Sequence, residues 1–268
     1  MQNILSVSSQ VALYSILLVA MCVCLLALGV AWIYSVVIKI NVWWTYRKYN
    51  KINTVQNIDA KTNAEYLLKS NNVNDVKVEK CGWFRGLLGL GMTGWGNSYS
   101  PRRKTIFLRK NIIDKATITS IGVSSQRVGQ AIMDKDDDKK LKTLNKLRPF
   151  YMFGPVLFLP IILVFSLLDL FVFKTSGLVA IVSVLFAFLY LVGAFVCLLI
   201  TIPVEKRANQ LALNALKESG MYTESELSAM QVVLNSYIKS YIADFIYAIV
   251  QISWEILKLI AKLCVKKK

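Results

Sequence analysis

The chain has 268 residues, of which 55% are hydrophobic, and 32 Lys and Arg stand against 16 Asp and Glu. A soluble domain of this length is less apolar, so the composition indicates an integral membrane protein. The chain has no histidine, and its five cysteines show no paired spacing outside the apolar runs. A conventional zinc site and a disulfide framework are therefore both excluded.

Three apolar runs are long enough to cross a bilayer as helices, which takes about 20 residues each. They cover residues 11–37, 153–173 and 178–202. The first run is too long for a signal-peptide core and lacks a basic flank before it, so we expect a retained anchor. Trp43 and Trp44 follow it and are typical of a membrane interface.

The distribution of charge predicts the orientation of the chain. Residues 39–150 hold 22 Lys and Arg against 9 Asp and Glu, whereas the first ten residues carry no charged side chain. The positive-inside rule then places the N-terminus outside and residues 39–150 in the cytoplasm of a multi-pass plasma-membrane protein. The basic face suits an anionic lipid surface as partner. Nucleic acid is not expected as a partner, because no binding motif accompanies the charge.

Residues 39–150 read as a mixture of helices and short strands. A capping box at 62–65 predicts a short helix, and strands are predicted at 75–80 and 104–110. A helix is expected from residue 111 to about 134. The stretch DKDDDKK that follows lacks the glycine and closing glutamate of an EF-hand, which favours a solvated charged linker over a calcium loop.

An apolar, glycine-rich stretch, CGWFRGLLGLGMTGWG, occupies residues 81–96 between the two predicted strands. Its G-x-G-x-x-G spacing is weak evidence for a dinucleotide site, because such a site opens a helix and here a strand follows. Soluble domains seldom expose so apolar a run, so we expect contact with a partner membrane protein or with lipid. The expected contact residues are Trp83, Phe84, Leu87, Leu88, Leu90 and Trp95.

Two helices are predicted after the third apolar run. The first begins near Pro203 and stops at Gly220, and a capping box at 223–226 opens the second. Residues 241–265 are apolar but interrupted by charges. They are expected to form an amphipathic helix that packs on the other helices or lies in the interface, rather than a further span.

Four stretches, in this order, carry a resemblance to a known family. They are TYRKYNK, TNAEYLLKSNNVNDVKVEK, SYSPRRKTIFLRKNI and TIPVEKRANQLALNALKESGMYTESEL. Together they resemble the YugP-type neutral zinc metallopeptidases, membrane-bound relatives of the gluzincin proteases. The resemblance runs from about Thr45 to the last helix.

The resemblance implies a fold and a domain order. It implies an α+β membrane protein with three transmembrane helices, a small cytoplasmic zincin-like domain of a short sheet plus helices, and a C-terminal amphipathic helix. The expected divisions are an anchor at 1–38, the zincin-like domain at 39–150, a pair of transmembrane helices at 151–202 and C-terminal helices at 203–268.

In that family the helix after the second strand carries H-E-x-x-H, whose histidines bind zinc and whose glutamate activates water. The matching positions here are Gln126, Arg127 and Gln130, within SSQRVGQAIM. An amide is a poor zinc ligand, and a guanidinium cannot act as a base at neutral pH. The family's third ligand resembles Glu205, which is retained, while its aspartate two residues later is replaced by Arg207.

The resemblance therefore implies a catalytically inactive homologue, a pseudoprotease without metal or other cofactor that acts as a membrane scaffold or a subunit of a membrane protein complex. One alternative is a peptidase with a non-standard metal site, built from Glu205 with Asp134 or Asp136. Another is a lipid-facing membrane organiser.

A geometric expectation follows for Glu205. We expect it within hydrogen-bonding reach of Gln126, Arg127 or Gln130, because a buried carboxylate needs partners. A surface pairing of Glu205 with Lys206 or Arg207 is the alternative.

Overall fold

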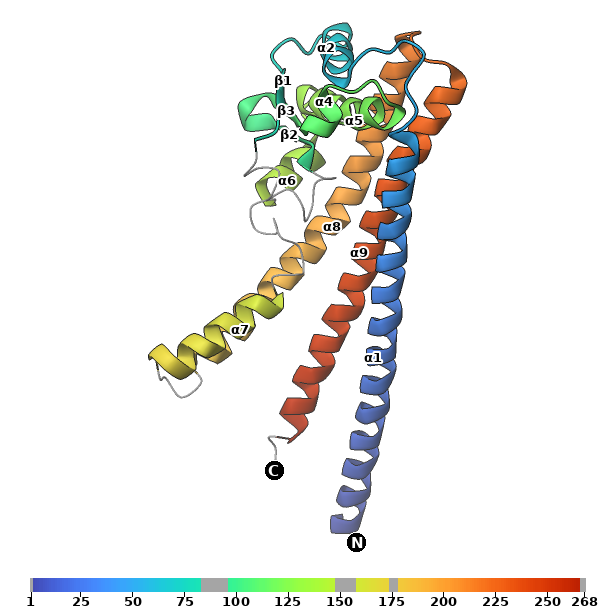
Figure 1. Cartoon of the computed structure of the whole chain (residues 1–268). Coiled ribbons are helices and arrows are strands. Elements are labelled where there is room, and N and C mark those ends of the chain that lie inside the picture. Colours follow the sequence, from blue (N-terminus) through green and yellow to red (C-terminus); the bar gives the residue numbers. More distant parts are fainter. Residues whose placement is uncertain (1, 83–95, 148–157, 174–177, 266–268) are drawn as a thin grey trace.

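The computed structural model describes residues 2–82, 96–147, 158–173 and 178–265. Its framework is three long helices: α1 (Gln2–Tyr49), α8 (Leu178–Glu218) and α9 (Glu224–Val265). Helices α1 and α9 run antiparallel and side by side, while α8 diverges from them toward α7 (Phe158–Leu168), and the small domain lies where the three long helices converge (Figure 1).

Helix α1 has the surface of a membrane helix. Leu18, Leu26 and Val30 expose 65%, 70% and 68% of their surface, a pattern that suits lipid and not water. Two stretches of the described chain are long and apolar enough to cross a bilayer, Tyr14–Tyr49 and Val184–Glu218. The apolar helix described at Ile162–Phe173 is shorter, so the predicted span at 153–173 stays a prediction.

Polar contacts join α1 to α9 along the apolar stretch. Asp244 of α9 accepts a hydrogen bond from Ser35 Oγ at 3.2 Å and pairs with Lys39 Nζ at 2.9 Å. Nearer the small domain, Val42 packs among Val123, Val233 and Tyr237. The expectation that the last helix packs on other helices is therefore confirmed, and its partner over this length is α1.

A three-stranded sheet forms the centre of the small domain. Strand β3 (Thr105–Leu108) lies in the middle, parallel to β1 (Lys77–Lys80) and antiparallel to β2 (Ser98–Ser100). All four residues of β3 are buried, as a central strand between covering elements requires. The predictions of β1 and β3 are confirmed, whereas β2 falls in a stretch where no strand was predicted.

The helices of this domain differ from the predictions at their ends. Helix α2 (Ala60–Ser70) is capped by Asp59, whose Oδ1 accepts from Thr62 N at 2.9 Å, so the capping box predicted at 62–65 is wrong. The helix predicted from residue 111 is broken into α4 (Lys110–Ile113) and α5 (Ile118–Lys135), because Thr117 starts a new helix as its N-cap.

The predicted break at Pro203 is also wrong, since α8 continues through it from the apolar stretch into the small domain. One helix therefore carries both a candidate span and Glu205. The end of α8 is as predicted: Gly220 has φ +66°, the left-handed conformation that glycine adopts at helix ends. The capping box at 223–226 is confirmed, with Thr223 N donating to Glu226 Oε2 at 2.8 Å.

Candidate functional site

Helix α5 is the buried helix of the small domain. Its residues 118–133 are all buried, with α2 on one side and α8 and α9 on others. An ordinary amphipathic helix buries one stripe only. Polar residues in the middle of α5 must therefore find partners within the protein, because burying an unsatisfied polar group is costly.

A glycine brings α5 and α8 into close contact. A Cβ atom added to Gly129 would lie 2.2 Å from the carbonyl oxygen of Ala208, a backbone atom that cannot move without moving α8. Gly122, about two turns earlier on α5, would have only ordinary contacts, with the nearest atom of Met230 at 3.6 Å from an added Cβ. Gly129 therefore sets the distance between the two helices where the polar residues of α5 face α8.

At this contact two amides converge on one carboxylate. Gln126 Nε2 donates to Glu205 Oε2 at 2.9 Å, and Gln130 Nε2 donates to Glu205 Oε1 at 3.0 Å. Each carboxylate oxygen thus accepts from a different turn of α5, because residues four apart share a helix face. The expectation that Glu205 lies within hydrogen-bonding reach of Gln126 or Gln130 is confirmed, and Glu205 is 3% exposed rather than paired at the surface.

Arg127 completes the charge balance of this cluster. Its Nη1 lies 3.5 Å from Glu205 Oε1, and the two side chains are 2% and 4% exposed. In the described part of the chain, its Nε and Nη1 make no hydrogen bond, and neither does the buried hydroxyl of Tyr237. The interaction between Arg127 and Glu205 is thus an ion pair without the bidentate geometry that guanidinium and carboxylate can form.

The cluster also reaches α9. Gln126 Nε2 donates a second hydrogen bond, to Asn209 Oδ1 at 2.6 Å, and Asn209 Nδ2 donates to the Leu234 carbonyl at 3.4 Å. We name Gln126, Arg127, Gln130, Glu205 and Asn209 the α5–α8 polar cluster. Asn209 has no feature in sequence that predicts its place, apart from lying one helical turn after Glu205.

A second buried polar chain supports α5 from the side of α2. Tyr222 Oη donates to Asn63 Oδ1 at 2.8 Å, and Asn63 Nδ2 donates to Ser125 Oγ at 3.1 Å. Burial raises the pKa of the Tyr222 hydroxyl, so it stays a donor. The contacts join residues 63, 125 and 222 across the chain, a combination that sequence spacing does not reveal.

Neither aspartate considered as an alternative metal ligand is shown in contact with Glu205. Asp134 Oδ2 accepts from Tyr99 Oη and from Lys104 Nζ, both at 2.8 Å. Asp136 is exposed. Throughout residues 2–82, 96–147, 158–173 and 178–265, no three His, Cys, Asp or Glu side chains gather as a metal-holding group.

Arg207 also has a partner. Its Nη1 donates to Asp138 Oδ2 at 2.7 Å, and the Asp138 side chain is 6% exposed. The prediction that residues 134–140 form a solvated linker is therefore wrong for Asp138, and also for Asp134, which lies in α5 with an 11% exposed side chain. The predicted contact residues Trp83, Phe84, Leu87, Leu88, Leu90 and Trp95 lie outside the described residues.

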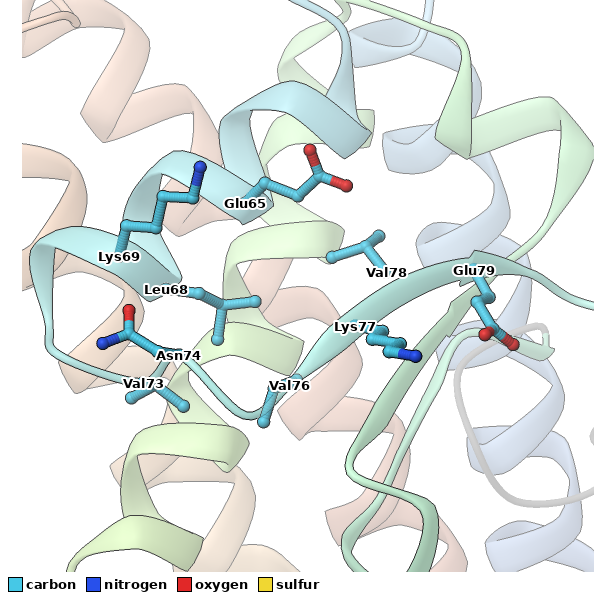
Figure 2. Close-up of a pocket in the computed structure, with 9 residues that line it drawn as sticks. All are labelled: Glu65, Leu68, Lys69, Val73, Asn74, Val76, Lys77, Val78 and Glu79. Atoms are coloured by element: carbon cyan, nitrogen blue, oxygen red, sulfur yellow. The ribbon is translucent and has the colours of Figure 1, made fainter.

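A surface pocket of about 430 Å³ lies apart from the cluster, between α2 and β1 (Figure 2). Leu68, Val73, Val76 and Val78 contribute its apolar part, and its charged residues are two lysines and two glutamates. None of the α5–α8 polar cluster lines this pocket. The pocket therefore adds no group to the candidate site.

Comparisons with known proteins agree on one family. The family model described as "Putative neutral zinc metallopeptidase" matches residues 23–260. The chain is also 26% identical, over 202 residues, to the "Putative membrane protease YugP" of Bacillus subtilis (strain 168), covering 74% of this chain and 79% of that protein. No solved structure matches the chain significantly.

Proposed function

Because the chain belongs to the neutral zinc metallopeptidase family, we propose that it is a member in which the zinc site has been replaced by the α5–α8 polar cluster. In this proposal the protein does not hydrolyse peptides and acts as a scaffold or subunit for other membrane proteins. The observation that carries it is the pair of hydrogen bonds from Gln126 and Gln130 to Glu205.

The residue types at the matched positions support the loss of catalysis. By the resemblance to the family, its two histidines correspond to Gln126 and Gln130, and its catalytic glutamate corresponds to Arg127. Arg127 cannot take a proton from water near neutral pH, because its guanidinium stays protonated. Glu205, which matches the third ligand, already accepts two amide hydrogen bonds and faces the Arg127 cation.

The donor set does not fit zinc. Structural and catalytic zinc sites use thiolate, imidazole and carboxylate ligands, usually three or four together. Here one carboxylate stands among two amides that offer their N–H groups to it, and a guanidinium lies 3.5 Å from one of its oxygens. A dication placed at this point would meet a fixed positive charge, so no catalytic step is assigned to a metal.

The same geometry would allow the fold to persist without metal. In a metallopeptidase the ion joins the two ligand histidines of one helix to a glutamate of another. Here the hydrogen bonds of Gln126 and Gln130 join α5 to α8 at that place, and Gly129 allows the helices to approach. A buried network with every carboxylate oxygen satisfied can specify one arrangement of helices.

The scaffold role rests on the membrane helices and the glycine-rich stretch at 81–96. In the proposal the domain faces the cytoplasm, and Trp83 and Trp95 contact a partner membrane protein or lipid. The double variant Trp83→Ala with Trp95→Ala is expected to lose proteins that co-purify with the wild type in mild detergent. Unchanged co-purification and membrane association would contradict this assignment of the contact surface.

Metal analysis of the purified chain tests the lost zinc site. The wild type is expected to retain no stoichiometric zinc after dialysis against trace zinc and to leave a casein substrate intact. The variant Gln126→His with Arg127→Glu and Gln130→His restores the family motif on the same helix. It is expected to bind about one zinc per chain, because the scaffold still holds Glu205 opposite α5.

A matched control separates the effect of the two histidine ligands from the effect of the Arg127 charge. Gln126→His with Gln130→His alone keeps the Arg127 cation and is expected to bind zinc more weakly than the triple variant. The proposal would be overturned if the wild type bound one zinc per chain and lost it in Glu205→Gln. Zinc-dependent cleavage of casein by the wild type would overturn it as well.

A further inference from the structure

Helix α6 (Lys139–Leu147) lies against α8 where α8 leaves its apolar stretch. The apolar cluster that α6 shares with α8 and with the end of α5 consists of Met133, Leu141, Leu144, Ala194, Cys197, Val204 and Ala208. Ala194 and Cys197 belong to the run 178–202 that is long enough to cross a bilayer, whereas Val204 follows its end. Helix α6 lies beside the middle of α8 (Figure 1), and a span at 178–202 would place it at the membrane boundary.

Polar contacts fix α6 in this place. Asp138 caps the helix by accepting from Leu141 N at 2.9 Å with Oδ1, and its Oδ2 accepts from Arg207 Nη1 of α8 at 2.7 Å. An N-cap of this kind stabilises a helix by about 1 kcal/mol. Together with the apolar cluster, Asp138 holds α6 as a short surface helix on α8.

The outer face of α6 is basic. Lys139, Lys142 and Lys146 are exposed, and their spacing of three and four places them on one side of the helix. The helix contains no Asp or Glu. Lys142 pairs with Asp137, while Lys139 and Lys146 have no ion-pair partner in the described part of the chain.

A cavity of about 340 Å³ lies between the start of α6 and the point where α8 leaves its apolar stretch. Lys139, Lys140 and Arg207 bring positive charge to it, and Pro203 lies on its apolar side. Of its two carboxylates, Asp138 is bound to Arg207, which leaves Asp136 against the two lysines. The cavity therefore keeps a net positive charge. Leu199, one helical turn before Pro203 on α8, is 46% exposed.

We propose that the basic face of α6 and this cavity bind the phosphate headgroup of an anionic phospholipid in the leaflet next to the small domain, with the acyl chains along α8. Lysines near a membrane surface attract anionic lipids within a short, salt-dependent range. The site would hold the small domain against the bilayer independently of the α5–α8 polar cluster.

Native mass spectrometry of the full-length protein in mild detergent tests the proposal. The wild type is titrated with phosphatidylglycerol and, separately, with phosphatidylcholine, and the fraction of protein that carries lipid is measured. A lysine near an anionic surface strengthens binding by roughly fivefold. The variant Lys139→Gln with Lys142→Gln and Lys146→Gln is therefore expected to need at least about tenfold more phosphatidylglycerol for equal occupancy.

The chain offers a control of equal charge. Lys69, Lys77 and Lys80 are exposed on α2 and β1 and do not line the cavity at α6, so their triple Gln variant is expected to bind phosphatidylglycerol as the wild type does. The triple Arg variant of the α6 lysines is expected to keep the binding. If the triple Gln variant of α6 fails to fold, Lys146→Gln alone is expected to weaken binding by roughly three- to fivefold.

Two results would overturn the proposal. One is equal occupancy by phosphatidylglycerol in the wild type and the α6 variant. The other is an equal loss of phosphatidylglycerol and phosphatidylcholine, which would show a change in general lipid adhesion rather than in a headgroup site.

Discussion

Removing the charge of Glu205 is the sharpest test of how the α5–α8 polar cluster stabilises the protein. In Glu205→Gln the shape of the side chain is kept, but Arg127 loses its buried counter-charge at 3.5 Å. Both side chains are almost fully buried, at 2% and 4% exposure, so solvent cannot replace the lost partner. Breaking a buried ion pair from one side costs about 3–5 kcal/mol.

Replacing Arg127 instead of Glu205 is expected to cost less stability. In Arg127→Met the Glu205 carboxylate keeps the hydrogen bonds from Gln126 and Gln130, so only the ion pair is lost. We expect a cost of about 1–3 kcal/mol, the range for removing one partner of a buried polar interaction. The double variant removes both charges and is expected to cost less than the sum of the two single changes by at least about 2 kcal/mol.

Thermal unfolding in detergent, followed by tryptophan fluorescence, measures these differences. A loss of about 4 kcal/mol corresponds to a fall in melting temperature of roughly 10 °C for a protein of this size. Lys206→Gln is the control, because Lys206 is exposed on the same helix and its replacement is expected to change stability little. Additive effects of the two single variants would refute the argument, since they would mean that Arg127 and Glu205 do not interact.

Three further predictions follow from separate features. Gly129→Ala is expected to destabilise the protein by about 1–3 kcal/mol or more in the same unfolding assay, because its Cβ would meet the Ala208 carbonyl. The control Gly122→Ala, where the contact is ordinary, is expected to be neutral or stabilising. Equal losses of stability in the two variants would contradict the close approach of α5 and α8. Burial opposes the charge of Glu226, but hydrogen bonds from Thr223 and Val55 outweigh this effect and lower the Glu226 pKa below its ordinary 4.5. The stability advantage of the wild type over Glu226→Gln is therefore expected to be complete above pH 4.5 and to vanish as the pH falls through the lowered pKa. An advantage that persists unchanged in acid would argue against this reasoning. In a variant without native cysteines, Asn72→Cys is expected to resist an impermeant thiol reagent in intact cells and to react after permeabilisation; labelling in intact cells would reverse the proposed orientation.

Local sequence signals determined the elements whose stability is local. The alternation at 75–80 predicted β1, the residues at 104–110 predicted β3, and the capping box at 223–226 marked the start of α9. The apolar runs indicated a membrane protein because a helix that crosses the hydrocarbon core needs about 20 mostly apolar residues. The resemblance also placed Gln126, Gln130 and Glu205 together, since a shared fold fixes which positions face one another.

Tertiary structure decided what local signals could not. Strand β2 has turn-like residues and forms because β3 offers it an edge. Pro203 reads as a helix start, yet α8 continues through it because packing on α5 and α9 outweighs one missing backbone hydrogen bond.

The partners of the buried polar groups were likewise beyond the sequence. Asn209 belongs to the α5–α8 polar cluster. Asp138, which was predicted to lie in a solvated linker, instead caps α6 and binds Arg207. In each case the residue alone favours a solvated position, and only contact with a distant helix removes it from water. Hydrophobic periodicity reports which face of an element is buried, but the choice of partner depends on how the helices cross in space.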